Sequence, residues 1–153
     1  MKFEYSLADD GATRALGAAV GAELRAGDVV ALRGELGAGK TTLVRGLIQS
    51  LLGVQTEVPS PTYNLVQMYE LDALTLWHFD LYRLETPDEV HELGWDDTAD
   101  GAALIEWPDR AGRHLPDWRL DVTLEIVGDA RTAILEPRGE DWQTRVHDID
   151  FKP

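Results

Sequence analysis

Cysteine is absent from this sequence of 153 residues, which excludes disulfide bonds, thiolate metal sites and cysteine nucleophiles. No apolar run approaches the roughly 18 residues that a membrane-spanning helix needs. The first residues, MKFEYSLADDG, contain no apolar core of a signal peptide. Because nothing in the sequence directs export or membrane insertion, we expect a cytoplasmic protein that does not act on membranes.

Basic residues are scarce and scattered. The chain has 14 lysines and arginines against 28 aspartates and glutamates, and its formal net charge is −14. A surface this negative repels a phosphodiester backbone unless a local basic patch offsets it, and no run of basic residues is present. We therefore expect that the protein does not bind nucleic acid directly. Any role in nucleic-acid metabolism should depend on a protein partner.

Composition and length predict one globular domain over residues 1–153. Hydrophobic residues make up 44% of the chain and charged residues 27%, which is typical of a protein with a single hydrophobic core. No internal repeat, low-complexity segment or linker divides the sequence. The polar stretch after about residue 137 carries no pattern that assigns it to an element.

The order of hydrophobic patterns predicts an α/β fold, namely a P-loop NTPase-like three-layer sandwich with a mixed, partly antiparallel sheet. Asp9 or Asp10 can cap the first helix, and Gly53 stands where a C-cap glycine belongs. Thr86 and Glu89 form a capping box at the start of a later helix. The predicted elements are helices over 12–24, 43–52 and from 87 onward, a buried strand over 29–32, a hairpin over 62–70 and 73–80, and strands over 102–105, 120–126 and 131–136.

Residues 34–41, GELGAGKT, match the pattern G-x-x-x-x-G-K-[ST] at every position, after a buried strand and at the start of a helix. Glycines let backbone N–H groups converge on phosphate oxygens, and the helix N-terminus adds partial positive charge. Lys40 can reach the β- and γ-phosphates, and the Thr41 hydroxyl can ligate Mg²⁺. A plain glycine turn would leave Lys40 opposing the helix dipole. The expected nucleotide-binding residues of this segment are Glu35, Leu36, Gly37, Ala38, Gly39, Lys40, Thr41 and Thr42.

Two acidic residues end short strand patterns and are candidates to bind Mg²⁺ or to orient the attacking water. Asp80 ends TLWHFD and Glu106 ends AALIE, so both can reach the same sheet edge as the glycine loop. The sequence does not rank them. We therefore expect catalysis to involve Lys40, Asp80 and Glu106, and metal binding to involve Thr41, Asp80 and Glu106.

Several other polar residues have two interpretations each. Thr62, in the proline-stiffened loop PSPTY, either senses the γ-phosphate or serves only the turn. His78 lies inside a strand pattern and is interpreted as a buried structural histidine rather than a catalytic one. Arg83 can face a phosphate or a partner, and Trp107 can be a core anchor or an interface residue.

Taken together, the segments GELGAGKTT, SPTYNLVQMY, HFDLYRL and IEWPDR, in this order and spacing, resemble the TsaE (YjeE) family over roughly residues 10–116. The resemblance implies a P-loop ATPase that binds ATP and Mg²⁺ and hydrolyses ATP slowly when alone. It also implies a role with the partners TsaB and TsaD, which transfer a threonylcarbamoyl group to adenosine 37 of tRNA. On the same basis Thr13 is assigned to the nucleotide site, and Arg131 is a further candidate contact.

Three alternatives remain. A GTPase normally reads guanine with an N-K-x-D loop, and the only asparagine, Asn64, is followed by leucine. A small-molecule P-loop kinase would use Arg110 and Arg113 as a lid that grips phosphate. A non-catalytic module would bind ATP without turnover. The docking face, stoichiometry and oligomeric state are not encoded in any recognisable motif.

Overall fold

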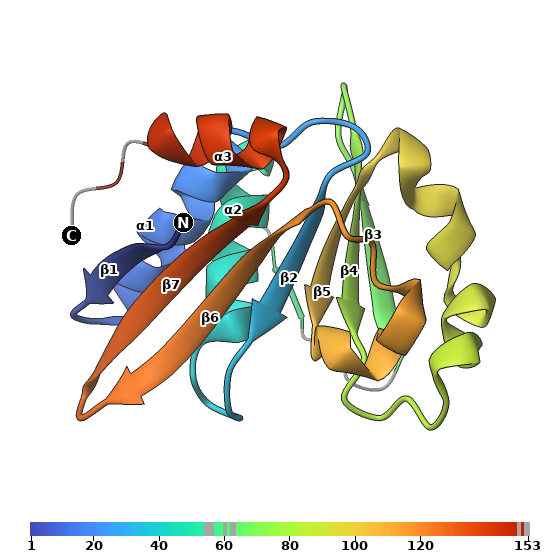
Figure 1. Ribbon diagram of the computed structural model, residues 1–153, viewed down its shortest axis with the longest axis horizontal. Coiled ribbons are helices and arrows are strands. Elements are labelled where there is room, and N and C mark those ends of the chain that lie inside the picture. The colour runs from blue at the N-terminus through green and yellow to red at the C-terminus, as the bar shows by residue number, and fades with distance from the viewer. Residues whose placement is uncertain (54–56, 60, 62–63, 150, 152–153) are drawn as a thin grey trace.

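The computed structural model of the protein describes residues 1–53, 57–59, 61, 64–149 and 151. These residues form a mixed sheet of seven strands in the order β1-β7-β6-β2-β5-β4-β3, with helices packed around it (Figure 1). The strands are β1 Phe3–Leu7, β2 Val29–Arg33, β3 Val66–Glu70, β4 Thr75–Asp80, β5 Ala102–Glu106, β6 Arg119–Val127 and β7 Ala130–Arg138. The helices are α1 Asp10–Gly21, α2 Lys40–Leu52 and α3 Glu140–His147, with the 3₁₀-helices η1 Pro87–Leu93, η2 Trp95–Asp100 and η3 Pro108–His114.

The sheet is parallel in its centre and antiparallel at both edges. Strand β2 runs parallel to β5 and β6, and β4 runs parallel to β5. The pairs β3–β4, β6–β7 and β1–β7 are antiparallel. The predicted α/β fold with a mixed, partly antiparallel sheet is therefore confirmed.

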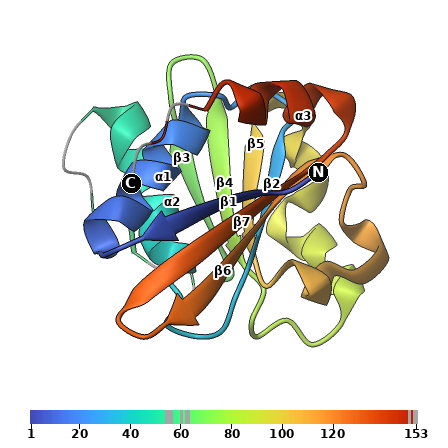
Figure 2. The ribbon, with the colours of Figure 1, turned by 60° about the vertical axis from the view of Figure 1, so that its left-hand side comes forward.

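Each face of the sheet has its own apolar cluster, which gives the three layers. One cluster joins the sheet to α1, α2 and α3 through residues such as Leu16, Leu47 and Trp142. The other joins β4 and β5 to the 3₁₀-helices through residues such as Phe79 and Val90. Figure 2 shows α1 and α2 on one side of the strands and the 3₁₀-helices on the other.

The two long helices cross closely because glycines face each other's backbone. A Cβ on Gly17 would lie 2.0 Å from the Leu43 carbonyl oxygen, and a Cβ on Gly46 would lie 2.2 Å from the Arg14 carbonyl oxygen. Neither contact tolerates a side chain, so both positions require glycine. The close crossing brings the first turn of α1 beside the loop that precedes α2.

Helix ends follow the sequence signals with some shifts. Asp9 caps α1, since its side chain accepts a hydrogen bond from the Ala12 N–H at 2.9 Å, and Gly53 ends α2 in the left-handed conformation. Helix α1 stops at Gly21 rather than at residue 24. The helix predicted from residue 87 is a 3₁₀-helix, although the Glu89 carboxylate does accept from the Thr86 N–H at 2.8 Å.

Four elements were not predicted: β1, α3 and the 3₁₀-helices η2 and η3. Strand β1 pairs with β7, and its alternating Phe3, Tyr5 and Leu7 were the available signal. Helix α3 lies in the unassigned tail, where Arg145 binds the Asp28 carboxylate through two nitrogens at 2.6 and 2.8 Å. Residues 62–63 of the predicted hairpin lie outside the described residues. No helix in the described ranges is long and apolar enough to cross a membrane.

Asp121 on β6 forms a buried charge cluster on the face opposite α1. It accepts hydrogen bonds from the Nε atoms of Arg119 and Arg138 at 2.9 and 2.8 Å, and Arg33 Nη2 lies 3.4 Å away. Burial alone raises the pKa of Asp121, but the hydrogen bonds from Arg138 and Arg119 outweigh it and the pKa is lowered. This carboxylate therefore stays ionised while it holds three arginines.

Candidate functional site

The loop between β2 and α2 has the backbone conformation that its glycines allow. Gly34, Gly37 and Gly39 have φ values of 146°, 83° and 106°, in the region that side chains disfavour. A Cβ on Gly34 would also lie 2.6 Å from the Leu124 carbonyl oxygen. Gly39 is the N-cap residue of α2, so Lys40 and Thr41 open the helix. Unpaired N–H groups at such a helix start are suited to bind anions.

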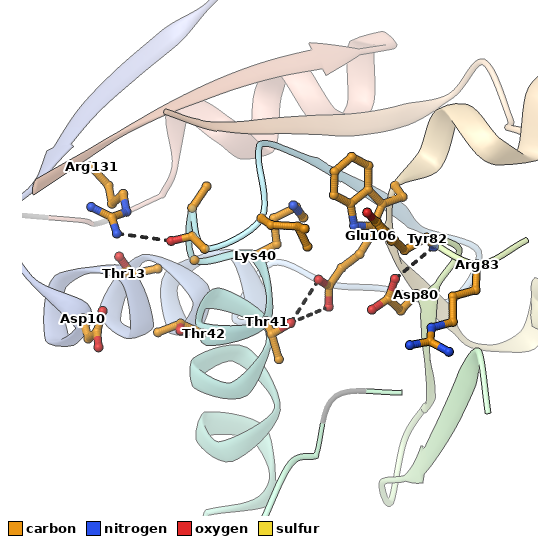
Figure 3. A pocket seen from close by; sticks show the side chains of 15 residues that line it. Asp10, Thr13, Lys40, Thr41, Thr42, Asp80, Tyr82, Arg83, Glu106 and Arg131 are labelled. Carbon is orange, nitrogen blue, oxygen red and sulfur yellow. Dashed lines mark hydrogen bonds between the residues drawn. The ribbon is translucent and has the colours of Figure 1, made fainter. Parts of the chain in front are cut away.

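This loop forms one wall of a cavity of about 640 Å³ (Figure 3). The first turn of α1 forms a second wall, and the carboxyl ends of β4 and β5 form a third. The lining residues are Asp10, Thr13, Leu36, Gly37, Ala38, Gly39, Lys40, Thr41, Thr42, Asp80, Tyr82, Arg83, Glu106, Trp107 and Arg131. Five segments distant in sequence thus meet at one end of the sheet.

The two candidate acids lie side by side at this end. Asp80 and Glu106 are direct register partners on the parallel strands β4 and β5, and both are almost fully buried. The Thr41 hydroxyl lies 3.0 Å from each oxygen of Glu106 and donates to that carboxylate. Glu106 is therefore fixed against the first turn of α2, as the dashed lines in Figure 3 show.

A buried histidine holds Glu106 from the other side. His78 Nε2 lies 2.6 Å from Glu106 Oε2, and the His78 side chain is fully buried. Since a carboxylate only accepts, we assign the Nε2 proton to His78 as donor. His78 is thus a buried histidine as predicted, but its contact with Glu106 was not predicted, because alternation along a strand does not reveal which acid lies on the next strand.

Asp80 has a different environment from Glu106. Burial raises the pKa of its carboxyl, and the nearby Glu106 acts in the same direction. The Tyr82 N–H donates to Asp80 Oδ1 at 3.1 Å and opposes this shift. The environment of Asp80 therefore favours its protonated form more than water does.

Lys40 lies at the centre of the site and is 5% exposed. Its ammonium donates hydrogen bonds to the carbonyl oxygens of Gly34 and Glu35, and it lies 4.1 Å from the centre of the Trp107 ring. Burial lowers the pKa of Lys40, and the nearby Glu106 and Asp80 carboxylates offset this only in part. Trp107 itself adopts a left-handed backbone with φ of 58°, and its ring also packs on Tyr82.

The opposite end of the cavity is formed by α1 and β7. Thr13 is 2% exposed and faces the loop from α1. From β7, Arg131 Nη2 donates to the Gly37 carbonyl oxygen at 3.1 Å (Figure 3). Asp10 also lines this end, and the sequence suggested it only as a helix cap. Asp9 caps α1 and its neighbour Asp10 lines the cavity, and the sequence alone does not show which of the two has which role.

Most predicted site residues meet in this cavity, with two exceptions. The Glu35 side chain is exposed and lines a smaller neighbouring cavity of about 440 Å³, although its carbonyl holds Lys40. Thr62 lies outside the described residues. The arginines proposed as a kinase lid do not line the main cavity: Arg110 lines the smaller one, and Arg113 pairs with Asp88 at 3.3 Å.

The donor set at the acid end fits a hard divalent cation. Thr41, Asp80 and Glu106 offer a hydroxyl and two carboxylates, which are the oxygen ligands that Mg²⁺ prefers. Two buried carboxylates next to each other also need a compensating positive charge beyond Lys40. The site can therefore place a cation next to the groups that would meet a phosphate.

Comparison with known proteins identifies the family. The family model "Threonylcarbamoyl adenosine biosynthesis protein TsaE" matches residues 7–133. The chain is 44% identical over 105 residues to the tRNA threonylcarbamoyladenosine biosynthesis protein TsaE of Haemophilus influenzae, which covers 67% of this chain and 66% of that protein. It is 38% identical over 119 residues to TsaE of Bacillus subtilis, which covers 76% and 73% of the two chains.

A solved structure agrees with this assignment. The crystal structure of Bacillus subtilis YdiB matches with a TM-score of 0.80 and 27% identity, over 97% of this chain and 94% of that one. The fold similarity therefore extends beyond residues 7–133, the region that the family model matches. Sequence, fold and site lead to the same conclusion: this chain belongs to the TsaE family of tRNA threonylcarbamoyladenosine biosynthesis proteins.

Proposed function

We propose that this protein is a Mg²⁺-dependent ATPase that supports threonylcarbamoyl transfer to adenosine 37 of tRNA by acting on a complex of TsaB and TsaD. The observation that carries the ATPase proposal is the contact between Thr41 and Glu106 at 3.0 Å inside a glycine-loop cavity. That contact joins a helix-start hydroxyl to a strand-end carboxylate, which is the pair that holds the metal in P-loop enzymes.

In this proposal the loop binds the phosphates. The N–H groups from Gly37 to Thr41 surround the phosphate oxygens, and the α2 N-terminus contributes its dipole. Lys40 exchanges the carbonyl oxygens of Gly34 and Glu35 for phosphate oxygens, which carry more negative charge. Thr13 and Arg131 lie at the far end of the cavity, where they are placed to contact the rest of the nucleotide.

Thr41 and Glu106 would hold the metal ion together, with Asp80 beside them. When bound there, Mg²⁺ supplies positive charge that stabilises the developing charge on the phosphate oxygens. His78 keeps Glu106 in the orientation that Thr41 also requires. Asp80 lies beside Glu106 at the same edge of the sheet and is the second candidate to orient the attacking water.

The negative surface favours a protein partner over direct contact with tRNA. With a net charge of −14, the protein repels nucleic acid but can approach a partner with a basic surface. The relatives' names place them in tRNA threonylcarbamoyladenosine biosynthesis, and this supports the same pathway for this chain. ATP turnover would then serve a cycle of the partner complex rather than a modification of tRNA by this chain itself.

Steady-state ATP hydrolysis by the purified protein tests the proposal, alone and with added TsaB and TsaD. We expect slow turnover alone, a sharp rise with the pair, and loss of both rates when Mg²⁺ is chelated. A rate that the pair leaves unchanged would contradict the partner role while keeping the ATPase. Tight ATP binding without turnover under any condition would instead support a non-catalytic module.

A further inference from the structure

A second group of ligating side chains lies on the 3₁₀-helices, away from the cavity. Asp88 and His91 come from η1, and His114 is the last residue of η3. One ligand atom from each residue lies within 4.8 Å of the other two, and all three residues are at least partly exposed. Nothing in the proposed ATPase uses these residues.

The local structure explains why these side chains converge. A 3₁₀-helix has three residues per turn, so residues three apart project from the same edge. Asp88 and His91 are such a pair in η1. Strand β5 and Trp107 then return the chain so that η3 packs beside η1, and its last residue, His114, reaches the same edge. The two imidazole rings lie edge to face, with centroids 4.7 Å apart.

The hydrogen bonds of the cluster match those around a bound metal. His114 Nε2 lies 2.7 Å from Asp88 Oδ1, in a hydrogen bond whose proton an ion bound between the two residues would replace. His91 Nδ1 lies 2.7 Å from Asp96 Oδ2. A carboxylate that accepts from one imidazole nitrogen orients the ring and leaves the other nitrogen as a ligand. Asp96 can serve His91 in this way.

The charges of the cluster also favour a cation. Asp88 is the carboxylate of the cluster, where it accepts a hydrogen bond from His114 and pairs with Arg113. Arg113 Nη2 lies 3.3 Å from Asp88, but its side chain is 80% exposed and is free to turn toward solvent when another cation binds. Imidazole nitrogens together with one carboxylate suit Zn²⁺ better than Mg²⁺.

We propose that Asp88, His91 and His114 form a binding site for Zn²⁺ or a chemically similar transition-metal ion that joins η1 to η3. A water molecule would complete the coordination. Since η3 begins directly after Glu106 and Trp107, an ion at this site would hold in place the segment that follows Glu106. The site does not depend on the ATPase proposal, because it shares no residue with the main cavity.

Titration calorimetry with Zn²⁺ tests the proposal on the full chain, in the presence of excess Mg²⁺ so that the oxygen ligands of the main cavity are occupied. We expect one Zn²⁺ per chain and a rise in melting temperature with Zn²⁺. The double variant His91→Gln/His114→Gln should bind at least tenfold more weakly. His147→Gln is the matched control, since His147 is exposed on α3 and packs on Phe3.

Co²⁺ provides an independent measurement of the ligand set. Intense visible absorption, typical of four-coordinate Co²⁺, should appear in the native protein and in His147→Gln but not in the double variant, and Zn²⁺ should abolish it. Absence of Zn²⁺ binding would overturn the proposal. Binding of equal strength in the double variant would overturn it as well. Far-ultraviolet circular dichroism confirms that the double variant is folded before either result is interpreted.

Discussion

Replacement of Lys40 by alanine should abolish most of the ATP affinity while leaving the protein folded. Among the described residues that line the cavity, Lys40 is the only lysine, and its ammonium donates to the carbonyl oxygens of the glycine loop. In the proposed complex this ammonium donates to phosphate oxygens at a buried position. Alanine leaves those oxygens without their main cation.

The size of the effect follows from burial. Removal of one partner of a buried, hydrogen-bonded charge pair costs about 2–5 kcal/mol, and Lys40 is 5% exposed. At about 1.4 kcal/mol per tenfold, the dissociation constant for ATP should rise roughly 30- to 4,000-fold. The loss should be largest at low salt and should remain substantial at physiological salt, because a buried pair is screened less than a surface pair.

The melting temperature of Lys40→Ala should be equal to that of the native protein or higher. Burial lowers the pKa of Lys40 in the folded state, so the charged form is less favourable there than in the unfolded chain. The charge of Lys40 therefore opposes folding, and its removal should leave the melting temperature unchanged or raised. Loss of ATP binding with retained stability separates a phosphate contact from a folding defect.

Equilibrium binding of a fluorescent ATP analogue, with thermal unfolding on the same samples, measures both quantities. Lys2→Ala is the matched control, since Lys2 is an exposed lysine at the start of the chain. Lys2→Ala should leave both the affinity for ATP and the melting temperature unchanged. Lys40→Ala with ATP affinity within threefold of the native value would refute the assignment of this loop as the phosphate site.

Three further predictions test the acids, the charge cluster and the helix crossing. Glu106→Gln should keep ATP affinity within about tenfold but reduce kcat at least a hundredfold in steady-state assays; the same pattern in Asp80→Asn alone would exchange the two roles. Asp121→Asn should lower the free energy of unfolding by about 3–5 kcal/mol in urea titrations. The pKa of Asp121 is lowered on folding, so the stability lost in Asp121→Asn should be largest above the pKa that Asp121 has in the unfolded chain. The loss should shrink as the pH falls through the pKa of Asp121 in the folded protein. A loss of stability that does not change with pH would contradict this assignment. Gly46→Ala should cost about 1–3 kcal/mol, since its Cβ would meet the Arg14 carbonyl at 2.2 Å, and native stability would contradict this packing.

Much of the fold could be predicted because its signals are local. Strand β2 and the start of α2 follow from a buried apolar run, three glycines and a lysine within about a dozen residues. Gly53 ends its helix as predicted, since only the left-handed conformation is needed there. The 3₁₀-helix η1 was predicted only as a helix, because the capping signal at Thr86 is common to both helix types.

The site was predicted in part for the same reason. Lys40 and Thr41 belong to one contiguous motif, and Asp80 and Glu106 could be named because both end short strands. The hydrogen bond between His78 and Glu106 depends on β4 and β5 being neighbours in register, which no local pattern encodes. Arg131 reaches Gly37 only because β7 folds back across 94 residues of sequence.

The sequence by itself determined the glycine loop, the positions of its lysine and threonine, and the mixed α/β class, since each depends on residues close together in the chain. The tertiary structure decided the strand order, the pairing of β1 with β7, the helix in the C-terminal segment and the partners of each buried charge. These depend on burial and on contacts between distant segments. The same packing decided that Asp80 and Glu106 lie side by side, because two parallel strands in register end at one edge of the sheet.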